Sequence, residues 1–253
     1  MTFALPHRRQ SLSLLLVLML LAGPAFAATA DTFAEGNAAY AKGDFKAALN
    51  LYSQALTTQQ TANIWYNFGN ANFRLGDLGH AAVAYERALV LLPWHSQAAA
   101  NLQFIRKKTT ARAPDPTALG IVLGAIPPAA SLWVAVGLAW LGFAWAGTAL
   151  WRRSGLGGVV GGLFLVALSA SYAAGVIWWH RELSLTGVVV ASSVQARHDP
   201  FEPGKNAETL PAGTALKRKS EAPVNGAHLY ELPGGSLRWI SSGGIDMIVG
   251  PNP

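Results

Sequence analysis

The sequence has 253 residues, of which 51% are apolar, and its formal net charge is +6. The absence of cysteine excludes disulfides, thiol redox chemistry, c-type haem attachment and cysteine-ligated zinc. The mean hydropathy of +0.28 is high for a soluble protein. Four of the positive charges are the pairs Arg8-Arg9 and Arg152-Arg153 beside apolar runs, so no basic stripe remains that would indicate nucleic-acid binding.

Residues 1–27 are predicted to be a secretory signal peptide. The basic segment His7-Arg8-Arg9 precedes an apolar run over residues 12–22, and Ala25-Phe26-Ala27 suits a signal peptidase. The run is shorter than the roughly 20 apolar residues that a transmembrane helix needs. An uncleaved anchor is the alternative, and it places the next segment on the same side of the membrane.

Two near-copies of one pattern begin at Gly36 and Gly69, an offset of 33 residues. Each copy starts with Gly-Asn, has an aromatic residue at its fifth position and a Gly-Asp turn, and continues into a helical run that ends in Ala-Leu. Helix pairs at this period are typical of helical repeats, which bury their apolar faces by stacking and present a concave surface.

The doubled segment resembles the tetratricopeptide repeat (TPR) family, which implies two TPR repeats over residues 28–95. The family's aromatic, small and terminating positions are matched in the second copy by Trp65, Phe68, Gly69, Phe73, Ala81, Tyr85, Ala88 and Pro93. The first copy matches with Gly36, Tyr40, Ala48, Tyr52 and Ala55, but Gln60 replaces the expected proline.

A capping helix is predicted over residues 96–108, because two repeats are fewer than a stable array usually has. Ser96 is the expected N-cap, and the apolar residues that follow it would pack on the repeats. Arg106-Lys107-Lys108 would lie at the favourable C-terminal end of the helix dipole.

In the TPR family the concave face comes from the first helix of each pair. Carried over by position, the resemblance implies that this chain's partner-binding residues are Asn37, Tyr40, Asn70, Phe73 and Arg74. Asparagine can bond a bound peptide's backbone, and Arg74 can pair with a carboxylate. The alternative is that the two asparagines have only local structural roles.

Residues 109–130 are predicted to be a linker with a short apolar segment that lies at the membrane interface or lengthens the next helix. Two uncharged runs follow, predicted as transmembrane helices over 131–151 and 156–179 because about 20 helical residues span roughly 30 Å. Arg152 and Arg153 in the loop 152–155 favour its cytoplasmic location. Both flanks of this hairpin are therefore expected in the periplasm.

Glycines recur around the start of the second run, in 155–162. They do not have the G-x-G-x-x-G spacing of a nucleotide loop. The pairs Gly157/Gly161 and Gly158/Gly162, with Ala135/Ala139 and Gly142/Ala146 in the first run, favour close packing of helices in lipid.

Residues 183–253 change to short β-rich runs separated by turn residues, which predicts a small all-β barrel. The Val-rich opening, Leu210-Pro211-Ala212-Gly213-Thr214 and Arg238-Trp239-Ile240 resemble a bacterial SH3-like domain. The polar insert over 197–208 departs from compact members of that family.

No catalytic constellation is visible. The six histidines are scattered singly, and His198-Asp199 lies in a polar loop where surface exposure is the expectation. We therefore expect no enzyme activity, no cofactor and no metal site.

The order of modules, covering nearly the whole chain, resembles the TPR proteins of the Bacteroides aerotolerance operon (BatE-like) family. The resemblance implies a scaffold in the bacterial inner membrane with periplasmic N- and C-terminal domains. Its implied partners are von Willebrand A-domain membrane proteins and a MoxR-type ATPase, in envelope or oxidative-stress tolerance. The alternatives are an SH3-like protein that binds peptidoglycan, and a TPR assembly factor for c-type cytochrome maturation.

Overall fold

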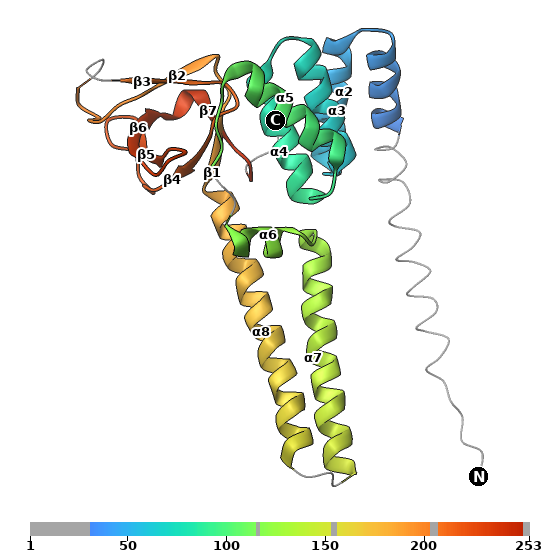
Figure 1. The fold of residues 1–253 in the computed structure, drawn as a ribbon. Coiled ribbons are helices and arrows are strands. Elements are labelled where there is room, and N and C mark those ends of the chain that lie inside the picture. The colour runs from blue at the N-terminus through green and yellow to red at the C-terminus, as the bar shows by residue number, and fades with distance from the viewer. Residues whose placement is uncertain (1–30, 115–116, 153–155, 203–206, 250–253) are drawn as a thin grey trace, which may run out of the picture.

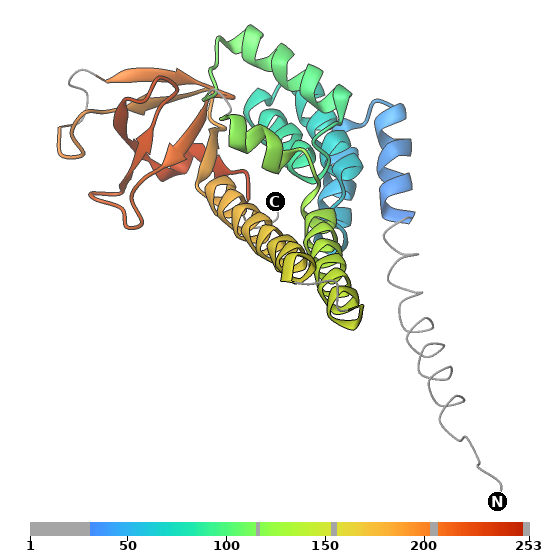
Figure 2. The same cartoon turned by 60° about the horizontal axis from the view of Figure 1, so that its bottom comes forward.

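The structure is a computed structural model that describes residues 31–114, 117–152, 156–202 and 207–249. The predicted signal peptide lies outside the described residues. Figure 1 shows three parts: a stack of helices, a long two-helix hairpin and a β region. The helical stack and the β region lie side by side at the same end of the hairpin in both views (Figures 1 and 2).

The stack begins with a helix described over residues 31–41. The helices α2 (Phe45–Thr58), α3 (Ala62–Arg74), α4 (Leu78–Leu91) and α5 (Ser96–Thr109) follow it. The predicted Gly-Asp turns are present: Gly43 and Gly76 have φ of +81° and +84°, and Asp44 and Asp77 cap α2 and α4 with their carboxylates. These turns reverse the chain and make the helices antiparallel neighbours.

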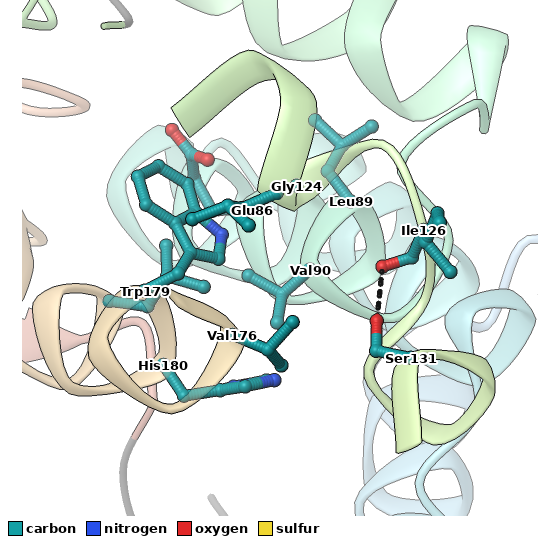
Figure 3. A pocket seen from close by; sticks show the side chains of 11 residues that line it. Glu86, Leu89, Val90, Gly124, Ile126, Ser131, Val176, Trp179 and His180 are labelled. Carbon is teal, nitrogen blue, oxygen red and sulfur yellow. Dashed lines mark hydrogen bonds between the residues drawn. The ribbon is translucent and has the colours of Figure 1, made fainter. Parts of the chain in front are cut away.

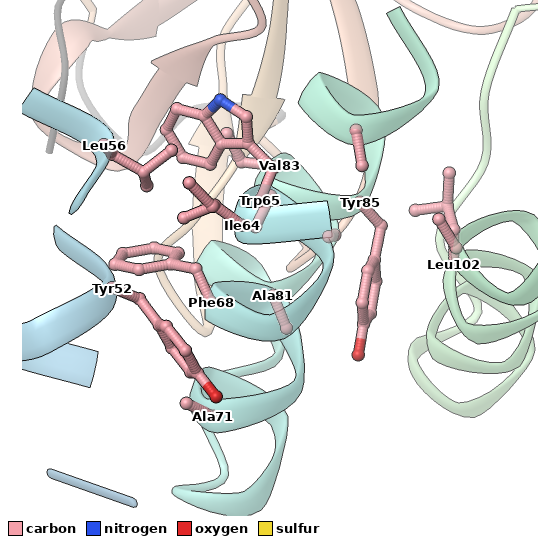
Figure 4. Packing of buried hydrophobic residues seen from close by; sticks show 14 of the residues in the cluster. Tyr52, Leu56, Ile64, Trp65, Phe68, Ala71, Ala81, Val83, Tyr85 and Leu102 are labelled. Atoms are coloured by element: carbon pink, nitrogen blue, oxygen red, sulfur yellow. The ribbon is translucent and has the colours of Figure 1, made fainter. Parts of the chain in front are cut away.

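Paired helices approach closely at Gly36 and Gly69. A Cβ atom on Gly36 would lie 2.6 Å from the Tyr52 ring, and one on Gly69 would lie 2.7 Å from the Tyr85 ring. The prediction that these glycines allow close helix contact is confirmed. The two tyrosine rings, with Leu56, belong to a core that runs through the whole stack (Figure 4).

The start of α5 differs from the prediction. The N-cap is His95, whose Nδ1 accepts a hydrogen bond from the Ala98 backbone N–H at 3.2 Å, so the assignment of Ser96 as N-cap was wrong. The His95 ring also stacks against Tyr66 at 4.7 Å between ring centroids. This packing holds the imidazole over the helix end, a tertiary contact that local sequence preference does not contain.

The hairpin consists of α7 (Pro128–Trp151) and α8 (Leu156–Ser184), and the short helix α6 (Ala118–Gly124) lies across its top (Figure 1). Both long helices are long and apolar enough to cross a membrane. A Cβ on Gly142 would lie 2.7 Å from the Gly162 carbonyl oxygen, and the Ser169 hydroxyl donates to the Ala135 carbonyl at 2.6 Å.

Only part of the predicted small-residue pattern lies in this helix contact. Gly142, Ala146 and Gly162 meet there, whereas a Cβ on Gly157 would have no described neighbour within 4 Å. A Cβ on Gly161 would meet only the Trp145 indole, at 3.7 Å, among the described atoms. Of this pair, Gly161 therefore lies beside Trp145 of α7, whereas Gly157 has no described neighbour there.

The β region has seven described strands in two antiparallel sheets. They are β1 (Thr186–Val189), β2 (Ser193–Ala196), β3 (Glu208–Pro211), β4 (Ala215–Arg218), β5 (Ala227–Glu231), β6 (Leu237–Ser241) and β7 (Ile245–Met247). One sheet has the order β6-β5-β4-β1-β7, the other is β2-β3, and an Arg197–Trp239 bridge joins them. Both sheets contribute to one core, which includes Val189, Leu210 and Ile240. The structure thus has an all-β region, and its assignment as an SH3-like barrel remains a proposal.

The helical stack and the β region share a continuous core, because Val188, Ala215 and Ile248 join the cluster formed by the repeats. The Arg87 side chain of α4 is 6% exposed and reaches into the β region. Its Nη2 lies 3.1 Å from the Asp246 carboxylate and 2.9 Å from the Met247 carbonyl, and its Nε donates to the Ile248 carbonyl at 3.2 Å. The segments before and after the hairpin therefore form one packed body.

Candidate functional site

The first helices of successive repeats are joined by a row of amide side chains. Asn37 Oδ1 accepts hydrogen bonds from the Tyr52 hydroxyl and from Asn67 Nδ2, both at 2.9 Å. Asn70 Oδ1 accepts in the same way from the Tyr85 hydroxyl at 2.8 Å and from Asn101 Nδ2 at 3.1 Å. Each oxygen thus ties a helix to its own pair and to the next repeat.

The tyrosines of this row are held as hydrogen-bond donors. Burial raises the pKa of Tyr52 to about 12, and burial raises the pKa of Tyr85 as well. Their phenols therefore stay protonated at neutral pH. This geometry supports the local role that sequence analysis left open for Asn37 and Asn70, and their part in partner binding remains a prediction.

A row of aromatic side chains runs beside the amides. Tyr40, Phe73 and Phe104 occupy the same position in the three first helices, counted from the row's asparagines. The Phe73 and Phe104 rings meet edge to face at 5.9 Å, and Tyr40 meets Phe45 in the same manner at 5.1 Å. Phe104 is 55% exposed, so an apolar face of this row is open to a partner.

Two cations lie over these rings. The Arg74 guanidinium is 4.4 Å from the centroid of the Phe45 ring, and Lys108 Nζ is 6.0 Å from the centroid of the Phe73 ring. These are cation–π distances, and both charges lie at the exposed side of the aromatic row. We call the surface formed by Tyr40, Phe73, Arg74, Asn101, Phe104 and Lys108 the repeat groove, after the concave face that the TPR resemblance implies. It combines rings, cations and amide groups, which suits contact with a peptide segment.

Asn101, Phe104 and Lys108 were missed by the sequence analysis. The signal was present, because Asn101-Leu102-Gln103-Phe104 repeats the Asn-x-x-aromatic spacing of Asn37 to Tyr40 and Asn70 to Phe73. Ala100 replaces the leading glycine, which hid the match. The helix α5 thus repeats the Asn-x-x-aromatic pattern of the two helices before it in the row.

Other polar residues have local roles. Asp199 Oδ1 accepts from the Phe201 backbone N–H at 2.8 Å, which stabilises a turn. Asp77 accepts from the His80 backbone N–H at 3.1 Å and pairs with the His80 imidazole at 2.7 Å on an exposed helix start. Among the described residues no group of three or more His, Cys, Asp or Glu side chains is placed to hold a metal ion.

Comparison with known families agrees with this geometry. The TPR repeat family model matches residues 36–76, a range that begins within the first helix and covers α2 and the whole of α3. No curated protein matches the chain. The protein therefore contains a TPR repeat, the class of helical scaffold that mediates contacts between proteins.

Proposed function

We propose that this protein is a membrane-anchored, non-enzymatic scaffold whose repeat groove binds a segment of another protein. The observation that carries the proposal is the row of exposed aromatic and cationic side chains on the first helices of a TPR array. Side chains of this kind dominate binding energy at protein interfaces. The two long apolar helices, α7 and α8, would hold the groove at the membrane.

The resemblance to BatE-like proteins gives the proposal its setting. The scaffold would lie in a bacterial inner membrane with both of its folded parts in the periplasm, beside von Willebrand A-domain proteins and a MoxR-type ATPase. The contacts of Arg87 with the residues around β7 support a common side for the two flanks. The Arg152-Arg153 pair between the spans supports a cytoplasmic loop.

Photo-crosslinking in cells tests groove binding. A photoreactive amino acid is placed at Phe104, which is exposed and belongs to the repeat groove. We expect one or a few protein adducts, and we expect Arg74→Gln to reduce their yield at least fivefold because it removes a cation from the groove. Lys107→Gln is the matched control, since Lys107 is an exposed cation of α5 outside the defined groove.

Equal adduct yields for Arg74→Gln and Lys107→Gln would contradict recognition through the repeat groove. The melting temperature of each variant, measured by circular dichroism, checks that both remain folded. If adducts form, their identification by mass spectrometry tests whether the partners are von Willebrand A-domain proteins.

A further inference from the structure

An apolar cleft lies under the helical repeats, where α4, α6 and α8 meet (Figure 3). Its volume is about 180 Å³. A second cavity of about 240 Å³ lies between α3, α4, the end of α8 and the residues after β7. The two cavities share Val90 and His180 in their walls, and we call them together the junction cleft.

The walls of the junction cleft are mainly apolar side chains from different elements. Leu89 and Val90 come from α4, Leu123 from α6, and Val176 and Trp179 from α8 (Figure 3). An apolar volume near 150 Å³ is large enough to hold a benzene-sized group. The first cavity alone therefore has room for a short stretch of hydrocarbon.

Two polar side chains around the first cavity, those of Glu86 and Ser131, have partners within the chain. The Glu86 carboxylate pairs with the Arg106 guanidinium. The Ser131 hydroxyl donates to the carbonyls of Pro127 at 3.2 Å and Ile126 at 3.4 Å. Among the described residues, the Trp179 indole and the His180 imidazole are the polar lining groups left to pair with a peptide backbone. Most amides of such a backbone would stay unpaired, which is costly, whereas a hydrocarbon chain has no polar groups to pair.

The location of the cleft points to the same kind of occupant. It lies at the repeat-facing end of α7 and α8, the two helices that would cross the membrane. Trp133 and Trp178, near this end, are 76% and 44% exposed, and tryptophan gathers at the boundary between headgroups and hydrocarbon. Because the cleft is at this level, lipid chains are its nearest apolar neighbours.

We propose that the junction cleft binds the acyl chain of a membrane phospholipid, so that the repeats sit directly on the bilayer surface. The inference rests on the membrane anchoring proposed above. Arg181, beside His180 in the last turn of α8, supplies a cation at the level of the lipid phosphates. Lipid in the cleft would join α4 to the hairpin by covering apolar surface on both.

The test uses the full-length protein in phosphatidylethanolamine–phosphatidylglycerol vesicles that contain a phospholipid with a photoreactive group in its acyl chain. After irradiation, mass spectrometry maps the labelled peptides. We expect label on the α4 peptide around Leu89 and Val90 as well as on α7 and α8. Leu89→Trp fills the cleft, and we expect it to reduce the α4 label at least fivefold.

The matched control is Val160→Trp, because Val160 is 62% exposed on α8 outside the cleft and should leave the α4 label unchanged. Leu123→Phe fills the same cleft from α6 and is the second variant if Leu89→Trp does not fold. Label on the outer faces of α7 and α8 without label on α4 overturns the lipid site while leaving membrane anchoring intact. The same α4 label in a folded, filled variant also overturns the site.

Two further outcomes distinguish the occupant and the anchoring. Crosslinking of α4 to a second protein in native membranes, with no lipid label on α4, overturns the proposal in favour of a peptide occupant. Recovery of the protein in the soluble fraction, with no lipid label anywhere, removes the membrane anchoring and the lipid site together.

Discussion

At the scale of single residues, the amide oxygens of Asn37 and Asn70 each accept two hydrogen bonds, one within a repeat and one from the next. The donors include the hydroxyls of Tyr52 and Tyr85, whose rings belong to the buried core of the repeats. Removal of such an acceptor leaves a buried donor unsatisfied, and this costs more than the bond itself contributes. The asparagines therefore stabilise the array whatever else they contact.

Asn70→Ala is expected to lower the free energy of unfolding by about 1–3 kcal/mol, because Tyr85 and Asn101 both lose an acceptor. Chemical denaturation followed by circular dichroism measures the change. Asn63→Ala, an exposed substitution on the same helix, is the control and should change stability by less than about 0.5 kcal/mol. Equal effects of the two substitutions would show that the amide row does not stabilise the repeats.

Alkaline pH should destabilise the repeats through Tyr52. Its pKa is about 12 in the folded protein because of burial, against 10.0 for the free side chain. The folded state therefore binds the phenolic proton more tightly than the unfolded state does. The stability that protonated Tyr52 contributes is fully present below about pH 10 and is lost as pH rises through about 12. The denaturation midpoint should be lower at about pH 11 than at about pH 8, and this difference should be smaller for Tyr52→Phe. The same difference in both proteins would assign the effect to other groups.

At the scale of elements, the hairpin shows which small residues bring helices together. Gly142 faces the Gly162 carbonyl, whereas a Cβ on Gly137 of the same helix would meet no described atom within 4 Å. Sequence spacing already separates these positions, because Ala146 lies four residues after Gly142, whereas Trp133 and Leu141 stand four residues from Gly137. In the structure, Gly142 lies on the side of α7 that faces α8, and Gly137 does not.

Gly142→Leu should separate α7 from α8 and lower the melting temperature in detergent, since overpacking typically costs about 1–3 kcal/mol. Gly137→Leu is the matched control on the same helix and should have little effect. A thermal-shift assay on purified full-length protein makes the comparison. If both substitutions lower the melting temperature equally, the contact at Gly142 and Gly162 is not what holds the hairpin together.

At the scale of the whole molecule, the helical stack and the β region are joined through Arg87. Burial lowers the pKa of Arg87, and the Asp246 carboxylate acts in the opposite direction. The guanidinium also lies 4.6 Å from the centroid of the Trp65 ring, so one side chain connects α3, α4 and the residues around β7. These contacts link segments about 160 positions apart in sequence.

Arg87→Met should destabilise the folded body by roughly 3 kcal/mol, because it leaves Asp246 and two backbone carbonyls without their donor. Differential scanning calorimetry should then show the repeats and the β region unfolding less cooperatively. Arg112→Met, which removes an exposed arginine side chain, is the control. An unchanged single transition for Arg87→Met would mean that the two parts are coupled by their apolar contacts alone.

The two flanks of the hairpin should be labelled from the same side of the membrane. Because the chain has no cysteine, a single cysteine can be introduced at exposed Gln54 or at exposed Phe201 without a background signal. An impermeant maleimide added to spheroplasts should label both. A cysteine at Ser154, in the loop between the spans, should react only after lysis. Labelling of only one of positions 54 and 201 in spheroplasts would place the two flanks on opposite sides of the membrane. This result would contradict their shared core.

Much of the local structure follows from particular residues. The recurrence of Gly36 and Gly69, with Asp44 and Asp77 after tight turns, identifies stacked helix pairs because close approach and capping are local requirements. The two uncharged runs identify α7 and α8 because length and hydropathy decide whether a helix can cross a bilayer. Strands β2 and β3 escaped prediction, since they are short and lie in polar or turn-rich sequence.

The repeated pattern and the apolar runs of the chain are sufficient to predict paired helices and a hairpin, because periodicity and composition act over neighbouring residues. The docking of the β region on α4 and the junction cleft depend on residues that are distant in sequence. Such contacts exist only once the hairpin has brought both flanks together, and no local pattern encodes which surfaces then meet.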